Sequence, residues 1–378
     1  MVGKDKDRIK VAMIGLRGIP ASNGGIEVAV EEISTRLAKL GCDVTVFCRS
    51  QYCLTRHKSY RGVNLKNIPT LNTKTTEAIV HSTAASMVAA LSDFDIVHFH
   101  AMANGIFSLL PKIAGKKTVV TFHGIDWERE KWGRLARAYI KFSERATYLL
   151  KNKVISVSNK IKDYCKNRFN FTDVTVIPNG VNIPKSRLIK SLKRFGLKRD
   201  GYILFLSRIV PEKEAHTLVK AFRKLKTRQK LVIAGPTTHT DDYLKKVKES
   251  AGDDKRIIFT GPLYGDEKTE AFSNCSFFVL PSTIEGMPIV LLEAMSFGKC
   301  PLVSDIAENL EVVDDSVSFS FKVRTVNDLA RKMDFMLKHK ATVNTKGRKA
   351  KELVKQKYNW DKIAEQTLEV YRKALGRQ

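Results

Sequence analysis

Two acidic residues follow a short apolar run in the second half of the chain. Glu285 stands in a turn-rich segment, Pro281-Ser-Thr-Ile-Glu-Gly-Met-Pro288, and Glu293 lies eight residues later in an otherwise apolar stretch. A carboxylate is costly in an apolar helix unless it faces a ligand or has a partner. Two carboxylates so placed suit hydrogen bonding to the vicinal hydroxyls of a sugar and a ribose, and Gly286 lets the backbone approach that ligand.

Two cations follow another apolar run. Arg208 and Lys213 lie five residues apart in the segment Ser207-Arg-Ile-Val-Pro-Glu-Lys213, directly after an expected strand at 202–206. On a loop that leaves the carboxyl end of a strand they can converge on a diphosphate, the arginine as a bidentate fork and the lysine as a point charge. By itself, the pair is equally well explained as surface charge in a chain with 66 Lys and Arg residues.

A glycine-rich segment joins the first expected strand to the first expected helix. It reads Ile14-Gly-Leu-Arg-Gly-Ile-Pro-Ala-Ser-Asn-Gly-Gly-Ile-Glu27 and contains the pair Gly24 and Gly25. Such a backbone can approach a phosphate and present N–H groups to it, although a mere tight turn explains the pair as well. The spacing is not GxGxxG, and no acidic residue follows at the expected distance, so a dinucleotide dehydrogenase is disfavoured.

Alternating strands and helices must position these residues. Short β-branched runs recur between amphipathic stretches, which predicts βαβ units and parallel sheets. The expected strands are 10–14, 43–47, 62–68, 96–99, 118–122, 153–157, 174–177, 202–206, 230–234, 257–260, 277–280 and 301–303. The clearest expected helices are 26–40, 215–225, 288–297 and 360–374.

The pattern restarts after the turn-rich segment Pro178-Asn-Gly-Val-Asn-Ile-Pro184, and 378 residues suit two domains. We therefore predict an α/β protein with two Rossmann-like, doubly wound parallel-sheet domains, at 1–184 and 185–359. The helix within 360–378 could pack back on the first domain. Ligands of such folds bind at the carboxyl ends of strands, so two facing domains would share a central cleft.

These motifs together resemble glycosyltransferase family 4. Glu285 and Glu293 match its E-x7-E motif, Arg208 and Lys213 match its R-x4-K pair, and Gly24-Gly25 resembles its amino-terminal donor loop. The similarity runs over nearly the whole chain. The phrases that look like a branch with rhamnosyl- and other transferases of bacterial surface polysaccharides are Arg17-Gly-Ile-Pro20, His123-Gly-Ile-Asp-Trp-Glu-Arg-Glu-Lys-Trp132 and Glu308-Asn-Leu-Glu-Val312.

The resemblance implies a GT-B fold, retaining transfer from a nucleotide-diphosphate sugar, and a role for each matching residue. Arg208 and Lys213 would hold the diphosphate and stabilise charge on the departing nucleotide. Glu293 would bind the ribose, and Glu285 would hold the transferred sugar. The remaining expected contacts are the backbone at Gly286 and Met287 to the sugar, His123 to the sugar, the Gly24-Gly25 loop to the phosphates, and Leu263 and Tyr264 to the base.

One position departs from the family pattern. Relatives usually have glycine directly after the lysine, whereas this chain has Glu214. The acid could moderate Lys213 or begin the next helix.

No metal or cofactor is expected. Two fixed cations and glycine-loop amides can neutralise the charge that a metal neutralises elsewhere, and no DxD motif stands at the end of an expected strand. His98, His100 and His123 could be imagined as three zinc ligands, but polar residues are expected at this edge of the sheet in any case.

Bulk charge bears on partners. The chain has 66 basic and 39 acidic residues, a net charge of +27, and the segment 129–168 alone holds twelve basic and three acidic residues. Such a field attracts anionic membrane, nucleic acid or acidic small molecules. Because relatives take the acceptor on the amino-terminal side, we predict that Lys131, Arg134, Arg137 and Lys141 help dock the protein on anionic lipid. A solvated basic face with a soluble acceptor is the alternative.

The expected partners are a nucleotide-sugar donor, a glycan or lipid-linked acceptor, and an anionic membrane surface. The expected location is cytoplasmic or peripheral on the inner face of the membrane, because no apolar run approaches the ~20 residues of a span and no cleavage site follows the first strand. Competing functions are a nucleotide-sugar epimerase or hydrolase on the same scaffold and, less favoured, a nucleic-acid-binding protein, for which no known motif is present. The six cysteines form no CxxC pair and are expected to be reduced packing residues.

Overall fold

The structure is a computed structural model, which describes residues 8–21, 24–52, 58–70, 76–129, 132–237 and 240–377. The chain divides into two compact units, of which the first comprises Met1–Asn179 with Trp360–Gln378 and the second Gly180–Asn359. The division thus falls after Asn179 rather than after Pro184, and the last helix belongs to the first unit.

The first unit contains an eight-stranded sheet among its described residues. Its order is β3-β4-β2-β1-β5-β6-β7-β8, and every pair is parallel except β3 with β4. The strands are β1 (Lys10–Ile14), β2 (Asp43–Arg49), β3 (Ser59–Tyr60), β4 (Val63–Ile68), β5 (Ile96–His100), β6 (Lys117–Phe122), β7 (Lys153–Ser156) and β8 (Val174–Val176). The seven strands that the sequence predicted here are confirmed within one or two residues. The two-residue β3 is too short to have a sequence pattern.

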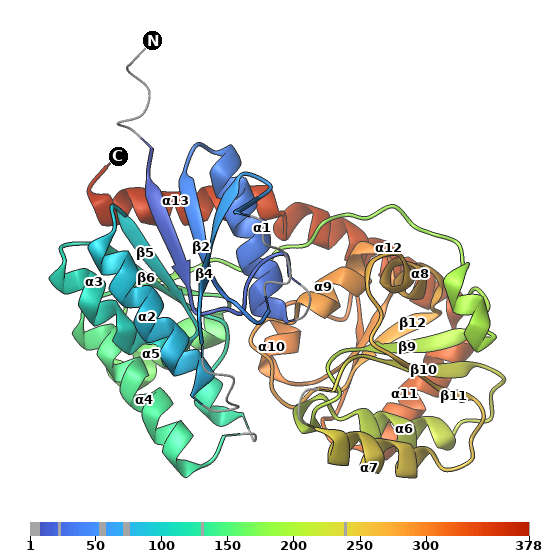
Figure 1. Ribbon diagram of the computed structural model, residues 1–378. Coiled ribbons are helices and arrows are strands. Elements are labelled where there is room, and N and C mark those ends of the chain that lie inside the picture. The colour runs from blue at the N-terminus through green and yellow to red at the C-terminus, as the bar shows by residue number, and fades with distance from the viewer. Residues whose placement is uncertain are drawn as a thin grey trace. The chain divides into compact units, whose positions relative to one another are not determined.

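Helices cover both faces of this sheet. They are α1 (Gly25–Lys39), α2 (Glu77–Leu91), α3 (Leu109–Ile113), α4 (Arg134–Leu149), α5 (Asn159–Phe169) and α13 (Trp360–Leu375), with 3₁₀ turns η1 (Met102–Ser108) and η2 (Asp126–Glu128). α1 and α13 pack side by side (Figure 1), although 320 residues separate them in the chain. α2 lies on the crossover from β4 to β5 and covers the other face, as a doubly wound sheet requires.

The second unit contains a six-stranded parallel sheet in the order β11-β10-β9-β12-β13-β14. The strands are β9 (Tyr202–Leu206), β10 (Lys230–Ala234), β11 (Ile257–Gly261), β12 (Phe277–Leu280), β13 (Pro301–Ser304) and β14 (Phe319–Phe321). The helices are α6 (Ala215–Arg223), α7 (Asp241–Ala251), α8 (Gly265–Asn274), α9 (Ile289–Ser296), α10 (Ala307–Leu310), α11 (Val326–Lys338) and α12 (Lys340–Lys357), with η3 (Ser191–Phe195) and η4 (Pro211–Lys213).

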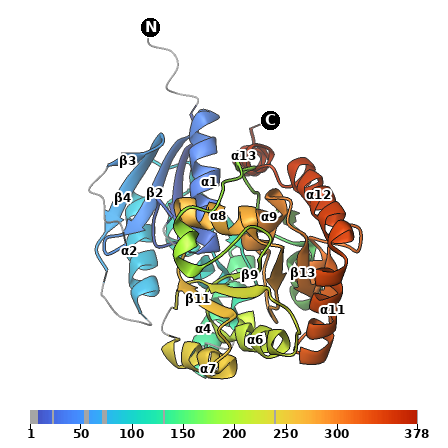
Figure 2. The same ribbon diagram turned by 90° about the vertical axis from the view of Figure 1, so that its right-hand side faces the viewer.

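A core of buried apolar residues joins this sheet to one helical layer. Phe205 of β9, Phe222 of α6, Val247 of α7 and Met333 of α11 belong to one cluster and have at most 1% of their surface exposed. These three helices lie together below the strands, while α8, α9 and α12 lie on the opposite side (Figures 1 and 2). This apolar seam fixes the strand ends from which the polar loops emerge.

Two global expectations bear on partners. The five cysteines in the described part of the chain are buried and unpaired, as expected for packing residues, and Cys53 lies outside the described residues. Among the helices that the structure describes, none is long and apolar enough to cross a membrane.

Candidate active site

The site in the second unit begins where the strand order reverses. β9 pairs with β10 on one side and with β12 on the other, so the chain leaves β9 and β12 in opposite directions. Such a switch point opens a crevice at the carboxyl ends of the strands. The loops after these two strands are joined there, because the amide of Thr283 donates a hydrogen bond of 2.9 Å to the carbonyl oxygen of Glu212.

Lys213 and Glu285 meet across these two loops. The Lys213 ammonium forms an ion pair with a Glu285 carboxylate oxygen, and only 10% and 8% of the two side chains are exposed. Taking two charges out of water is costly unless each compensates the other or a ligand replaces one partner. Arg208 lies five residues earlier on the same loop and is half-buried. The structure thus brings together the basic and acidic motifs that stand 72 residues apart in the sequence.

Glu293 has a cation of its own. It lies within α9 and accepts a hydrogen bond of 2.5 Å from the ammonium of Lys268 on α8, and the two side chains are 21% and 31% exposed. The sequence reasoning missed Lys268, because a lysine in the first turns of an exposed helix is ordinary and no spacing links it to Glu293. The pair keeps an ionised carboxylate available at the edge of an otherwise apolar helix.

The remaining predicted donor contacts of the second unit lie in the adjoining turns. Gly286 and Met287 are buried just before α9 begins at Ile289. Leu263 is buried, and Tyr264 is the half-exposed N-cap residue of α8, the helix that carries Lys268. Tyr264 and Lys268 are therefore one helical turn apart.

The departure at Glu214 has a conformational explanation. Glu214 adopts φ 51° and ψ 33°, the left-handed conformation, as the last residue before α6. Only glycine adopts this conformation without steric cost, which explains why a glycine suits this position in relatives. Glu214 thus begins the next helix, and its side chain turns toward α6.

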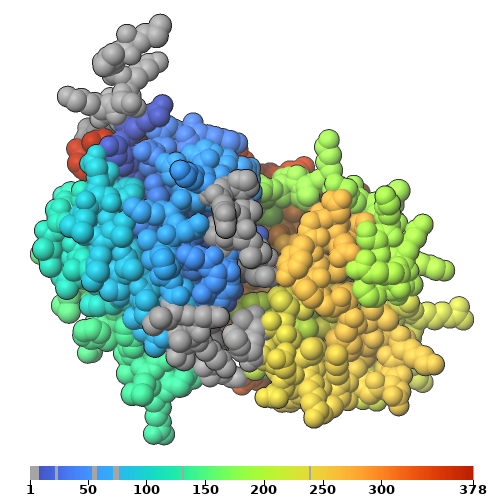
Figure 3. All heavy atoms as spheres, in the orientation of Figure 1, coloured from blue at the N-terminus to red at the C-terminus, as the bar shows by residue number. Residues whose placement is uncertain are grey.

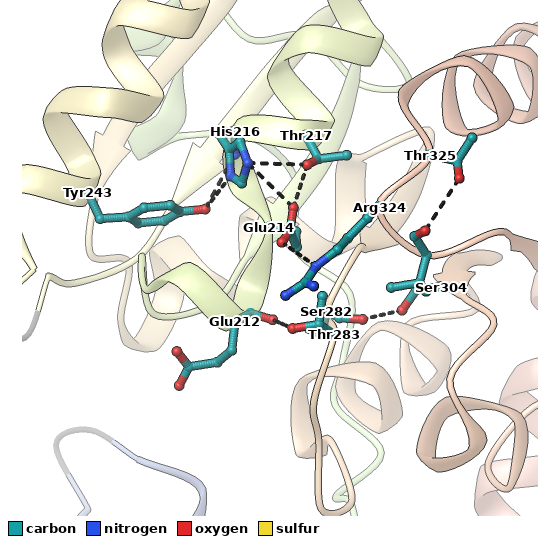
Figure 4. A network of polar contacts seen from close by, with 11 residues as sticks. Glu212, Glu214, His216, Thr217, Tyr243, Ser282, Thr283, Ser304, Arg324 and Thr325 are labelled. Atoms are coloured by element: carbon teal, nitrogen blue, oxygen red, sulfur yellow. Dashed lines mark hydrogen bonds and ion pairs between the residues drawn. The ribbon is translucent and has the colours of Figure 1, made fainter. Parts of the chain in front are cut away.

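A buried polar network compensates this strained residue (Figure 4). The Glu214 carboxylate accepts a hydrogen bond from the Thr217 hydroxyl, lies 3.4 Å from Nε of Arg324, and lies 3.6 Å from Nε2 of His216. Burial lowers the pKa of His216 although Glu214 opposes that shift. Arg324 also has a left-handed backbone, with φ 60°. Two strained residues of different loops thus stabilise each other beside the Lys213 turn.

The glycine-rich loop lies in the first unit, after β1. Gly24 caps α1 with φ 102°, and a Cβ atom there would lie 2.1 Å from a carboxylate oxygen of Glu27. That carboxylate accepts a hydrogen bond of 3.3 Å from the amide of Arg17, and Glu31 accepts one of 2.6 Å from the amide of Ala21. Backbone amides of the loop therefore already bind carboxylate oxygens, the same interaction that a phosphate oxygen would make. Ser22 and Asn23 lie outside the described residues.

Three buried histidines line the ends of β5 and β6, and we call His98, His100 and His123 the histidine ladder. His100 and His123 are joined by a ring-nitrogen contact of 3.1 Å, and the rings of His98 and His100 stack with centroids 4.3 Å apart. Burial is the main cause that lowers the pKa of His98 to about 3 and that of His123 to about 4, and it lowers the pKa of His100 strongly. The ladder is therefore neutral at pH 7.

The geometry of the ladder does not suit a zinc ion. The two ring nitrogens of His98 lie 2.6 Å from the Tyr371 hydroxyl and 2.7 Å from the Thr121 hydroxyl, so both are already in hydrogen bonds. Within the described ranges, no group of three His, Cys, Asp or Glu side chains could hold a metal ion. A neutral His123 at the end of β6 can instead exchange hydrogen bonds with a hydroxyl.

Two Rossmann-like units with cations and carboxylates at strand ends define the GT-B class of glycosyltransferases. The family model described as Glycosyltransferase Family 4 matches residues 23–185, and the model described as Glycosyl transferases group 1 matches residues 190–369. In tandem the two models cover most of the chain, and the chain belongs to the family 4 glycosyltransferases.

Individual relatives agree in length and fold. The chain is 26% identical to the UDP-Gal:alpha-D-GlcNAc-diphosphoundecaprenol alpha-1,3-galactosyltransferase of Escherichia coli, over 80% of this chain and 81% of that protein. Sucrose-phosphate synthase from Thermosynechococcus elongatus has a similar structure, with a TM-score of 0.84, 20% identity, and 98% and 100% of the two chains covered. Anabaena HepE in complex with UDP and glucose has a TM-score of 0.81, 17% identity, and 97% and 100% coverage. These structural likenesses concern the fold.

Proposed function

We propose that this glycosyltransferase moves a sugar from a nucleotide-diphosphate donor to an acceptor with retention at the anomeric carbon and without a metal ion. The observation that carries the proposal is the buried pair of Lys213 and Glu285 at the junction of the β9 and β12 loops, with Arg208 on the same loop. An ammonium ion held by a carboxylate at a switch point is ready to exchange that partner for a ligand anion.

The chemistry asks little of these groups beyond charge and position. The bond between the anomeric carbon and the phosphate oxygen breaks, and its electron pair stays on the nucleoside diphosphate. Lys213 and Arg208 stabilise the negative charge that develops there, and Glu285, once Lys213 binds the phosphate, accepts hydrogen bonds from sugar hydroxyls. Retention requires the acceptor oxygen to approach the face that the diphosphate leaves, so a diphosphate oxygen can take the acceptor proton.

Glu293 and His123 complete the proposed donor contacts. Glu293 sits on α9 next to Tyr264 and Lys268 of α8, an arrangement that suits a ribose placed beside a base. His123 is neutral, so it can orient a sugar hydroxyl without repelling the cations of the diphosphate site. The glycine loop would supply amides to the phosphates if a phosphate oxygen displaced the Glu27 carboxylate from the Arg17 amide.

The proposed acceptor is a glycan or a lipid-linked glycan in the synthesis of a bacterial polysaccharide or glycoconjugate. The name of the Escherichia coli relative specifies a UDP-sugar and an acceptor on diphosphoundecaprenol, and HepE was solved with UDP and glucose, which supports uridine among the donor bases to be tested first. An epimerase or hydrolase on the same scaffold would turn over the donor without any acceptor. A purely nucleic-acid-binding role is disfavoured by the family.

A donor panel tests the proposal. UDP-, GDP- and dTDP-sugars are compared by thermal shift, since a ligand at a hundred times its Kd stabilises by about 2.7 kcal/mol. The stabilising donor is then incubated with lipid-linked and soluble glycan acceptors, with and without EDTA, and the anomeric configuration of the product is read by NMR. We expect acceptor-dependent, EDTA-resistant transfer with retention.

Three outcomes would each contradict part of the proposal. Rapid donor turnover that ignores the acceptor would favour a hydrolase or epimerase. Complete loss of activity with EDTA and its recovery with manganese or magnesium would remove the metal-free mechanism. An inverted product would remove retention.

A further inference from the structure

An exposed apolar stripe runs along the outer face of α4. Leu135, Phe142 and Leu149 follow one another at seven-residue steps, and 89%, 61% and 81% of their surfaces are exposed. Ala138 and Arg145 complete the same helical face and are exposed as well. Large apolar side chains scattered singly on a surface are ordinary, but three aligned on one helix face mark a surface that binds a partner.

The opposite face of α4 already provides the packing that the unit needs. Ser143 accepts a hydrogen bond of 3.1 Å from the amide of Ile106 and donates one of 2.9 Å to the carbonyl of Met102, which ties α4 to η1. At Gly105 of η1 a Cβ atom would lie 1.8 Å from the Thr147 hydroxyl, so the two elements are in close contact. The outer stripe is therefore not required for folding of the core.

The charges around the stripe are positive. Arg134 and Arg145 are exposed on α4, and Lys151 is exposed just beyond its end. The one acidic residue of the helix, Glu144, is fully buried, where Tyr148 and Tyr164 donate hydrogen bonds of 3.3 and 3.1 Å to its carboxylate. Burial raises the pKa of Glu144 to about 7, so it adds little negative charge to this surface at neutral pH.

The end of α3 extends the same surface. The Lys112 ammonium donates a hydrogen bond of 3.1 Å to the carbonyl oxygen of Lys151, which brings α3 against the last turn of α4. Ile113, the next residue, is 75% exposed. Helices α3 and α4 form part of the outer surface of the first unit (Figures 1 and 3).

Other cations of the basic run are engaged within the protein. Lys141 lies 4.4 Å and Arg168 5.3 Å from the centre of the Trp127 ring, and Lys153 pairs with Asp173 at 2.7 Å. Arg137 is half-buried, and Lys131 lies outside the described residues. Of the four residues predicted to dock the protein on lipid, Arg134 is thus the one that the structure shows fully exposed.

We propose that the outer face of α4, with Ile113 of α3, inserts its apolar side chains into the interfacial region of an anionic lipid bilayer. We call this surface, made of Leu135, Phe142, Leu149, Ile113, Arg134, Arg145 and Lys151, the α4 surface. A helix that combines large apolar side chains with basic residues matches the two components of such an interface, acyl chains below and anionic headgroups above. A second copy of the chain would bring the same cations face to face. For its biological use this inference rests on the proposed lipid-linked acceptor, although binding itself is measured without any transfer.

Vesicle binding tests the α4 surface. The full chain is sedimented with vesicles of phosphatidylcholine alone or mixed with phosphatidylglycerol, at low and high salt. Two variants divide the surface: Leu135→Ser with Phe142→Ser removes apolar groups, and Arg134→Glu with Arg145→Glu reverses charges. Leu188→Ser is the matched control, because Leu188 is 76% exposed but lies in the second unit.

The expected results separate insertion from simple charge attraction. The wild-type chain should bind the anionic vesicles and bind phosphatidylcholine poorly. The serine variant should bind about tenfold or more weakly at both salt concentrations, because apolar burial is not screened. The glutamate variant should lose binding mainly at low salt, and the control should bind like the wild type. Tryptophan at position 142 should be quenched by brominated lipid, whereas tryptophan at position 188 should not.

Several results would overturn the inference. Absence of binding to anionic vesicles at low salt would do so, as would equal binding by the wild-type chain and both α4 variants. Conversion of a dimer to a monomer by the serine variant, seen by light scattering without lipid, would assign the stripe to self-association instead. Donor binding by thermal shift is measured in parallel. A chain that binds a nucleotide sugar but no vesicles keeps the proposed function and loses this surface, and the converse result does the opposite.

Discussion

Replacing Glu214 with glycine tests whether this residue is held in a strained conformation. Its backbone angles, φ 51° and ψ 33°, cost an L-amino acid about 1–2 kcal/mol relative to glycine. The change also removes a carboxylate that is 9% exposed and contacts Thr217, Arg324 and His216. The hydrogen bond from Thr217 contributes about 1 kcal/mol. The pair with Arg324 contributes less than about 1 kcal/mol, since 61% of that arginine is exposed.

Comparison with alanine separates strain from lost contacts. Glu214→Ala and Glu214→Gly both remove the carboxylate, but alanine keeps the strain and glycine relieves it. The glycine variant should therefore be more stable than the alanine variant by about 1 kcal/mol, and it should unfold at a temperature about 2–4 °C higher. At Lys220, an exposed position inside α6, the order should reverse, because glycine is about 1 kcal/mol less favourable than alanine in a helix.

The assay is thermal and urea unfolding of the four purified full-length variants under the same conditions. The reasoning fails if Glu214→Ala equals or exceeds Glu214→Gly in stability while the Lys220 pair shows the ordinary order. A matching pair at Arg324, whose φ is 60°, should repeat the sign found at Glu214.

The other predictions concern the proposed donor site and the histidine ladder. Arg208→Ala and Lys213→Ala should each lower kcat about a hundred- to a thousandfold, and losses under threefold in both would refute the diphosphate site. Glu293→Gln should weaken binding of the free nucleoside diphosphate, whereas Glu285→Gln should spare it and lower turnover; calorimetry showing equal effects would merge these roles. Because the folded ladder has lowered pKa values, the unfolded chain binds more protons below about pH 6.5, and stability should fall toward pH 4 by roughly 1–4 kcal/mol per pH unit. The raised pKa of Glu144 opposes part of this loss, and urea unfolding at pH 7 and 5 that shows no decrease would contradict the assignment.

Most strands could be predicted because parallel strands buried on both faces leave a direct signal in the sequence. Continuous apolar runs such as 202–206 and 277–280 coincide with β9 and β12 to the residue. β14 was missed because Phe319-Ser-Phe321 is short and interrupted by serine. The domain boundary was predicted after Pro184 from turn residues. The structure places it after Asn179, because the bridge from Val181 to Asn359 joins the intervening segment to the second unit.

The candidate site was predictable only as separate motifs. The spacing of Arg208 and Lys213 and that of Glu285 and Glu293 stand in the sequence, and each motif indicates its chemistry. Which charge meets which does not follow from spacing: Glu285 pairs with Lys213, whereas Glu293 pairs with Lys268, a residue that no pattern distinguished.

The sequence by itself determined the class of protein, because side-chain chemistry and apolar periodicity are local properties that it records directly. It indicated two Rossmann-like domains, a family of sugar transferases and the residues for a diphosphate and two sugars. The tertiary structure alone decided that Glu214 occupies a left-handed turn stabilised by Arg324, and that Leu135, Phe142 and Leu149 are exposed while Glu144 is buried. Those outcomes depend on which residues, distant in sequence, the sheets and helices bring into contact, and a one-dimensional pattern does not contain that information.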